Sequence, residues 1–249
     1  KLNELFKSDR KGFEEKWNDI NMFIKYGMLS DEKFAEKAND FCLLKNAEGN
    51  SYTLKEYYEK VKDIQVDKDG NIVYLYSNDL TQQDSFITSV KTKGYDVLVL
   101  DGPLDTHITG YLEQKGGDKV QLKRVDADVA EKLIPKEETI SLLLSEDEAK
   151  QAKELFEQAI ARADMQVEVT ALDASELPVS VTTDEFMRRM KDMAKTGGGM
   201  GFYGTIPDNY KVSVNGNHPL VKRILESSNG EGAELAKQAF DLALLSRGL

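Results

Sequence analysis

A pair of short apolar runs with a helical segment between them narrows the possible folds of this chain more than any other feature. Residues 72–76 read IVYLY and follow an Asp-Gly turn, and residues 96–100 read DVLVL. Apolar runs of this length are typical of strands that are covered on both faces in a parallel sheet. The segment 80–93 has helical periodicity, and a helix over 104–113 and a strand over 120–123 continue the alternation. The sequence therefore predicts a small parallel sheet with right-handed crossovers.

Helical patterns fill the region before these strands. Apolar residues from Phe13 to Ile24 step by four, three and four, which predicts one helix with Gly27 as its stop signal. Ser30 is expected to cap a second helix. Thr53 begins a Thr-Leu-Lys-Glu sequence with the spacing of a capping box, which predicts the start of a third helix there.

The pattern changes after about residue 135. Asn217 is expected to cap a helix that has Pro219 in its first turn. We therefore predict two domains, over 1–135 and 136–249. The expected fold class is α/β and then α+β, with a helical coil and a small three-layer parallel-sheet subdomain followed by a mixed α+β domain. In the second domain we expect helices over 146–162 and 231–245 and strands over 165–171, 179–181 and 210–214.

Composition excludes several classes of protein. The formal net charge is -11, and such a surface would repel nucleic-acid phosphates. Cys42 is the only cysteine, so an intrachain disulfide and a thiolate metal cluster are excluded, and its apolar neighbours predict a buried side chain. The two histidines lie outside ligand spacing of one another, which argues against a metal site. No apolar run approaches a membrane span of about 20 residues, and we expect a cytoplasmic protein with no membrane partner.

The segment 183–204 combines an amphipathic helix with a glycine-rich run. It contains four of the seven methionines, and its apolar side chains recur at helical spacing while charged ones, including Arg188, fill the other face. Such a stripe is typical of a core. It is also typical of a surface that accepts varied partners, because methionine adapts to many shapes and the adjoining glycines are mobile. Both interpretations stay open on the residues alone.

The motifs of known catalytic sites are weak or missing. Gly199, Gly201 and Gly204 match the spacing of a dinucleotide fingerprint, but they follow a helix where that fingerprint must follow a strand. Asp101 and Asp105 flank a turn after a strand, where α/β proteins often bind ligands. Turn formation and helix capping explain these two residues equally well. An α/β enzyme or small-ligand-binding protein using this turn is therefore the alternative function.

Four segments, in order along the chain, resemble the 90-kDa heat-shock protein chaperone family. Residues 13–27 (FEEKWNDINMFIKYG) resemble the family's "FW..F...LK.G" helix, and 71–77 (NIVYLYS) resemble its "KIYYITG" strand. Residues 93–105 (KGYDVLVLDGPLD) are similar to "KGYEVLLLDDPID". The stretch 218–249, which begins HPLVKRILES and ends FDLALLSRGL, is similar to "HPLVKRL…LLDQALLAEG". The resemblance covers most of the chain.

The resemblance implies a fragment of a bacterial ATP-driven clamp. Its parts would be the end of the middle domain, over 1–135, and the carboxyl-terminal dimerisation domain, over 136–249, without its last helix. The family's nucleotide pocket and its catalytic arginine would precede Lys1. We therefore expect no catalytic residue and no cofactor in this chain, with ATP and Mg belonging to the full-length protein. A purely structural dimerisation module is a further possibility.

The resemblance also implies particular site residues. Its partners would be unfolded client proteins and a second copy of the chain. The middle-domain client segment maps to Thr106, His107 and Gly110, although relatives carry Trp where this chain has His107. The implied client residues of the amphipathic helix and the loop after it are Phe186, Met190, Met193, Met200, Phe202 and Tyr203. The implied dimer interface is Phe240, Leu244 and Leu245.

Overall fold

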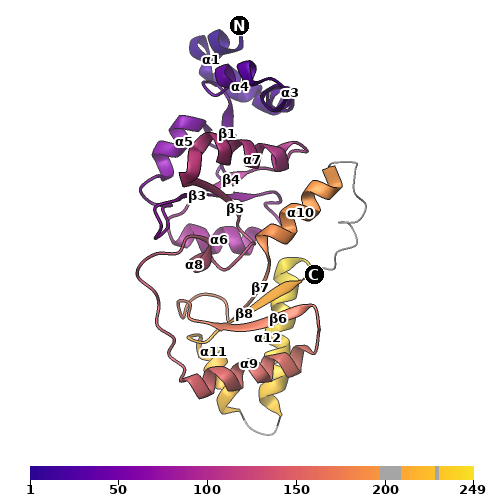
Figure 1. Cartoon of the computed structure of the whole chain (residues 1–249). Coiled ribbons are helices and arrows are strands. Elements are labelled where there is room, and N and C mark those ends of the chain that lie inside the picture. The colour runs from indigo at the N-terminus through magenta and orange to yellow at the C-terminus, as the bar shows by residue number, and fades with distance from the viewer. Residues whose placement is uncertain (197–208, 228–229) are drawn as a thin grey trace. The chain divides into compact units, whose positions relative to one another are not determined.

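The computed structural model describes residues 1–196, 209–227 and 230–249. The chain divides into two compact units, and each is described by itself (Figure 1). Unit 1 consists of residues 1–81 and 90–125, and unit 2 of residues 82–89 and 126–249. Each unit has its own hydrophobic core. The predicted mixture of helices and small sheets is confirmed.

Unit 1 begins with four helices around an aromatic core. The ring of Phe13 is fully buried and meets Trp17 at 6.0 Å and Phe41 at 6.1 Å between ring centroids. Aromatic pairs at such distances add to the stabilisation that burial alone provides. The four helices are α1 (Leu2–Ser8), α2 (Arg10–Glu15), α3 (Trp17–Ser30) and α4 (Glu32–Ala38).

Gly27 does not end a helix, and this part of the prediction is wrong. It lies inside α3, which runs on to Ser30. A Cβ atom at Gly27 would come within 2.7 Å of the Phe34 ring, so the glycine serves the close packing of α4 on α3. The cap of α4 is also displaced by one residue, because the side chain of Asp31 accepts from the Phe34 amide at 3.0 Å.

The predicted parallel sheet is present in unit 1. It has the strand order β4-β3-β5, and both neighbouring pairs are parallel. All six residues of the central strand are buried, as expected of a strand covered on both faces. The helix before β4 begins at Asp84, four residues later than expected. The elements of this region are β3 (Ile72–Ser77), α6 (Asp84–Thr92), β4 (Val97–Val99), α7 (Asp105–Gly116), η1 (Gly117–Lys119) and β5 (Val120–Arg124), and most of α6 belongs to unit 2.

A short antiparallel hairpin, which the sequence did not predict, joins the helices to the sheet. It pairs β1 (Leu43–Lys45) with β2 (Ser51–Thr53), and three-residue strands are too short to show a period. The expected capping box at Thr53 is confirmed and opens α5 (Leu54–Val61). Cys42 is buried as expected, and burial raises the pKa of its thiol to about 12.

Unit 2 packs helices on a mixed three-stranded sheet. The strand order is β6-β8-β7, with β6 parallel and β7 antiparallel to the central strand. The core lies between this sheet and α9, α11 and α12, and its centre includes Phe156 and Phe240. The elements are α8 (Ala130–Leu133), α9 (Glu146–Ile160), β6 (Met165–Thr170), β7 (Val179–Thr183), α10 (Glu185–Thr196), β8 (Tyr210–Asn215), α11 (Pro219–Glu226) and α12 (Glu231–Arg247).

His218 caps α11 in place of Asn217, which corrects the sequence prediction. The Nδ1 atom of His218 accepts from the Leu220 amide at 3.0 Å. Asn217 holds a neighbouring loop, because its side chain donates to the carbonyls of Ser141 and Leu172 and accepts from the Leu143 amide. A cap that is itself a histidine makes this helix start sensitive to pH.

Candidate functional site

An arginine on another helix, with a side chain only 10% exposed, fixes the start of α10. Arg247, at the end of α12, forms an ion pair with Asp126 and donates to the Thr183 hydroxyl at 2.9 Å. Asp126 is only 1% exposed, so its carboxylate is removed from water and depends on such contacts. The Arg247 guanidinium also lies 5.4 Å from the centre of the Phe86 ring. The strand that leads into α10 therefore ends at a defined place.

Local charges stabilise the first turn of α10. The Asp184 side chain accepts from the Met187 amide at 3.1 Å, which satisfies one of the free amides at the helix start. Glu185 pairs with Arg188 and, at 2.7 Å, with Arg189. Acidic side chains at this end also complement the helix dipole. The helix that carries the apolar stripe thus begins in a well-determined geometry.

The burial of side chains on α10 differs from the expected pattern at Arg188. Phe186 is 68% exposed, whereas Met187 and Met190 are half-buried. The expectation that Arg188 lies on a charged outer face is wrong, since it is only 5% exposed and is paired with Glu185. An arginine that is paired with a carboxylate can be buried at a position that the helical spacing assigns to the charged face. The large aromatic group of the helix is thus the one in contact with solvent.

The remaining expected residues of this region lie outside what the structure describes. Met193 is on α10, but the side chains of 191–196 are outside the described part. Met200, Phe202 and Tyr203 lie outside the described residues altogether, and so do the three glycines of the weak dinucleotide match. The structure therefore brings Phe186 and Met190 to the candidate surface of unit 2.

The second expected client segment lies on α7 in unit 1. Thr106 is half-buried, and His107 and Gly110 are exposed. His107 lines a hollow of about 670 Å³ whose other walls come from α3 and α4. A Cβ atom at Gly110 would meet nothing within 4 Å, so this face of α7 is open. The three residues share one helix, and His107 adjoins a space large enough for a side chain of a partner.

Asp105, one half of the alternative ligand turn, serves the fold. It is 2% exposed, and its carboxylate accepts from the Lys25 ammonium at 2.5 Å and from the Gly102 amide at 2.9 Å. This ion pair joins α3 to the start of α7. Asp101 is exposed and lines a different hollow, of about 560 Å³. Among the residues that the structure describes, no group of His, Cys, Asp and Glu could hold a metal ion.

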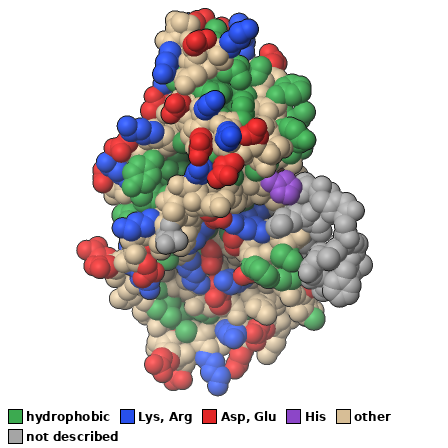
Figure 2. All heavy atoms as spheres, turned by 45° about the horizontal axis from the view of Figure 1, so that its top comes forward, with side chains coloured by type: hydrophobic (Ala, Val, Ile, Leu, Met, Phe, Trp, Pro, Cys, Tyr) green, Lys and Arg blue, Asp and Glu red, His purple; other side chains and the backbone are tan. Residues whose placement is uncertain are grey.

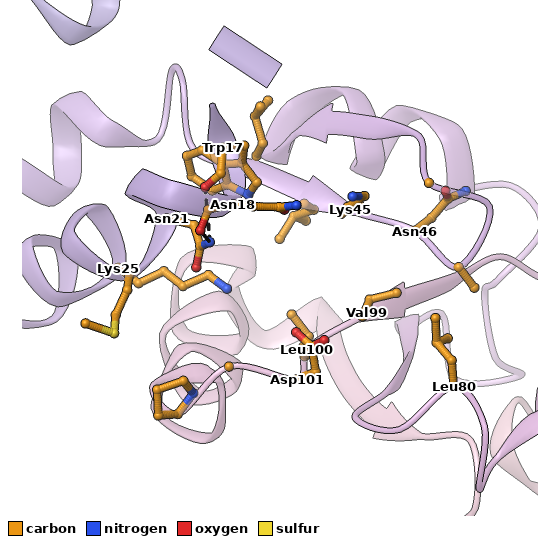
Figure 3. A pocket seen from close by; sticks show the side chains of 17 residues that line it. Trp17, Asn18, Asn21, Lys25, Lys45, Asn46, Leu80, Val99, Leu100 and Asp101 are labelled. Atoms are coloured by element: carbon orange, nitrogen blue, oxygen red, sulfur yellow. Dashed lines mark hydrogen bonds between the residues drawn. The ribbon is translucent and has the colours of Figure 1, made fainter. Parts of the chain in front are cut away.

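The hollow beside Asp101 is built by α3, the β1 region and the end of β4 (Figure 3). In this view the side chain of Lys25 reaches from α3 toward Leu100 and Asp101 on the opposite wall. Asn21 turns its amide back onto its own helix and donates to the Trp17 and Asn18 carbonyls. The walls thus combine apolar side chains with polar ones, among them Lys25, Lys45 and Asp101.

The three residues expected at a dimer interface have different environments in unit 2. Phe240 is 3% exposed and belongs to the core, and Leu244 is partly buried against that core. Leu245 is 72% exposed, and Leu242, which the sequence analysis did not single out, is 66% exposed. These two leucines are three positions apart on α12 and share a face. Their spacing of three positions is the sequence signal that could have identified Leu242 together with Leu245.

Comparison with known proteins agrees with this mixed α/β architecture. The family model described as Hsp90 protein matches residues 1–249. "Chaperone protein HtpG" of Porphyromonas gingivalis is 44% identical over 228 residues, which cover 90% of this chain and 33% of the relative. The HtpG of Bacteroides thetaiotaomicron is 42% identical over 229 residues, and that of Bdellovibrio bacteriovorus is 25% identical over 262 residues. The Bacteroides match covers 91% of this chain and 34% of the relative, and the Bdellovibrio match covers 99% of this chain and 39% of the relative.

The chain belongs to the Hsp90 protein family. It spans about a third of the length of the Porphyromonas and Bacteroides HtpG proteins. The resemblance deduced from four sequence segments is therefore confirmed. In the described part of the chain, no helix combines the length and the apolar character needed to cross a bilayer.

Proposed function

We propose that this chain is a chaperone segment that binds unfolded or partly folded client polypeptides through exposed apolar side chains. Phe186 is the observation that carries the proposal. A large aromatic ring that is 68% exposed, on a helix whose start is fixed by Arg247, is ready to contact a partner without prior rearrangement. Membership of the Hsp90 family and the name chaperone in the relatives support this interpretation.

The geometry favours weak binding that tolerates many shapes. Burying one phenylalanine contributes about 1.5–3 kcal/mol, and ordering the client offsets part of it. The half-buried methionines beside Phe186 can adapt to different side chains because the thioether is flexible. A site of this kind binds extended segments that are apolar, and it does not require a particular amino-acid sequence.

His107, Thr106 and Gly110 form the second part of the proposed client surface. The hollow beside His107 can accept a side chain, but imidazole is a weaker apolar anchor than the tryptophan that the family resemblance implies at this position. We therefore assign the stronger contribution to Phe186. In this proposal client binding by the chain requires no nucleotide.

The direct test is to change Phe186 to Ser and measure how well the chain suppresses aggregation of a thermally unfolded protein. Since the Phe186 side chain is exposed, the fold should persist by circular dichroism while suppression requires roughly tenfold more chain. Leu143→Ser is the matched control, because Leu143 is 76% exposed in the same unit and outside the proposed surface. Equal suppression by wild type and Phe186→Ser, with the fold intact, would refute the role of α10.

We also propose that two copies associate through the exposed face of α12. Leu242 and Leu245 support this second function, because two large aliphatic side chains on one helix face are costly to leave in water. A purely structural dimerisation module would use the same face without binding clients. The aggregation assay and the oligomeric state therefore distinguish the two functions.

A further inference from the structure

The exposed face of α3 is a continuous apolar strip that the proposed function does not use. It consists of Met22, Phe23, Tyr26 and Leu29, with exposed fractions of 47%, 70%, 64% and 37%. Figure 2 shows hydrophobic side chains gathered at the upper right of the view, over the helices that begin unit 1. Other α3 residues, Trp17, Ile24 and Met28, supply the core contacts of the same helix. The fold of unit 1 therefore does not need the strip.

Each end of this α3 strip borders a hollow. Met22 lines the space of about 560 Å³ whose far wall is residues 99–103, and Leu29 lines the space of about 670 Å³ beside His107. Seven helical positions separate the two residues, which is a rise of roughly 10 Å. An extended chain covers that distance in about three residues. Two side chains of one extended segment can thus enter the two hollows while the backbone crosses the strip.

Polar groups in the walls suit a polypeptide backbone. A lysine ammonium has three donors, and the Asp105 carboxylate accepts one from Lys25. The Lys25 side chain reaches toward the space in Figure 3, where a peptide carbonyl could accept another. Its ion pair with Asp105 already balances the charge, which favours a neutral acceptor over an anion.

The charges around the α3 strip carry both signs. Lys45 and Asp101 line the first hollow, and Glu32 and Lys115 line the second, together with Asp31. No single sign dominates, so the walls offer little attraction for a highly charged partner. A neutral, apolar segment fits them best, and its binding should depend weakly on salt.

The spacing of the two hollows, together with the modest area of the strip, favours a client over a second copy of the chain. The four side chains of the strip expose on the order of 450 Å². A stable dimer needs roughly 800 Å² from each partner. We infer that the α3 strip, with the hollow at each of its ends, binds an extended, apolar segment of unfolded polypeptide, which extends the client surface of unit 1 from His107 across α3. This inference rests on the proposed function and names a further surface for it.

The test uses fluorescein-labelled, reduced and carboxymethylated α-lactalbumin as a permanently unfolded probe, with binding measured by fluorescence anisotropy. Phe23→Ser and Phe186→Ser should each weaken binding about fivefold, and the double variant should be weaker than either. Ile64→Ser is the control, because Ile64 is 50% exposed in unit 1 and lies outside the strip and its hollows. The salt dependence of binding between 50 and 500 mM should be the same for the wild type and Phe23→Ser, because the strip itself carries no charge.

The outcomes separate the two proposals. Phe23→Ser at wild-type affinity, with Phe186→Ser weakened, overturns the α3 site and leaves the proposed function standing. The reverse result removes α10 and keeps the α3 site. If wild type does not bind the probe, both fail. A change in oligomeric state on Phe23→Ser would assign the strip to a second copy and overturn the inference.

Discussion

At the scale of single residues, distant partners decide roles that neighbours in the sequence leave open. Asp105 could be a ligand or a turn residue on sequence grounds, and its contact with Lys25, eighty positions earlier, makes it structural. Gly27 could end a helix, but the Phe34 ring requires a residue without a Cβ there. His218 caps α11, and the side chain of Asn217 instead donates to the Ser141 carbonyl. Each of these roles depends on a tertiary contact that no local pattern reports.

His218 should make unit 2 less stable as the pH falls. Burial lowers the pKa of His218 from its ordinary value of 6.5, and the neutral Nδ1 accepts the capping bond. The unfolded chain then binds more protons than the folded one just below pH 6.5, so stability is full above that pH and declines as the pH drops. Denaturant unfolding of wild type and His218→Asn between pH 5 and 7.5 tests this.

Asparagine caps helices without titrating, so the variant should match wild type at pH 7.5 within about 0.5 kcal/mol. Its stability should then decline less than that of wild type toward pH 5. Identical pH profiles for the two proteins would show that the His218 cap does not contribute.

At the scale of elements, the hydrophobic periodicity of the sequence was sufficient to predict most of the helices and strands. The buried strand β3 and the charged helix α9 were expected at nearly their observed positions, because long, strongly patterned segments carry a clear period. The β1–β2 hairpin was missed because its strands are three residues long. On α10 the helix was expected correctly, but the burial of Arg188 was not, since its pairing with Glu185 is a matter of side-chain geometry.

The packing of α3 on α4 gives a prediction at this scale. Gly27→Ala should destabilise unit 1 by about 1–3 kcal/mol, because the new Cβ would press on the Phe34 ring. Gly110→Ala is the control within another helix of the same unit. Its Cβ meets open space, so the higher helix propensity of alanine should stabilise by about 0.5–1 kcal/mol. Thermal unfolding of both variants is the measurement, and a Gly27→Ala protein as stable as wild type would contradict the packing argument.

At the scale of the whole molecule, the family could be deduced from the sequence and the surfaces could not. Four motifs in order were enough to indicate the Hsp90 family, which the comparisons confirm. Phe23, Phe186 and Leu245 are exposed because other residues of their helices pack into the hydrophobic cores. A stripe at helical spacing predicts an apolar face but does not say whether that face is covered.

The α12 face gives a prediction about assembly. Light scattering of the wild-type chain should report twice the mass of one copy at micromolar concentration. Leu245→Glu should shift the equilibrium to the monomer, because a charge would replace a leucine at the centre of the contact. Leu177→Glu, at a 46% exposed leucine of unit 2 that is not part of α12, should remain dimeric. A wild type that is monomeric at all concentrations would rule out this interface.

The claim that this chain recognises unfolded polypeptide is tested most directly by one pair of titrations. Labelled α-lactalbumin is offered to the wild-type chain once in its reduced, carboxymethylated and unfolded form and once folded with its disulfides intact. We predict saturable micromolar binding of the unfolded form and at least tenfold weaker binding of the folded form. Equal affinity for both forms, or no binding of either, would contradict the account.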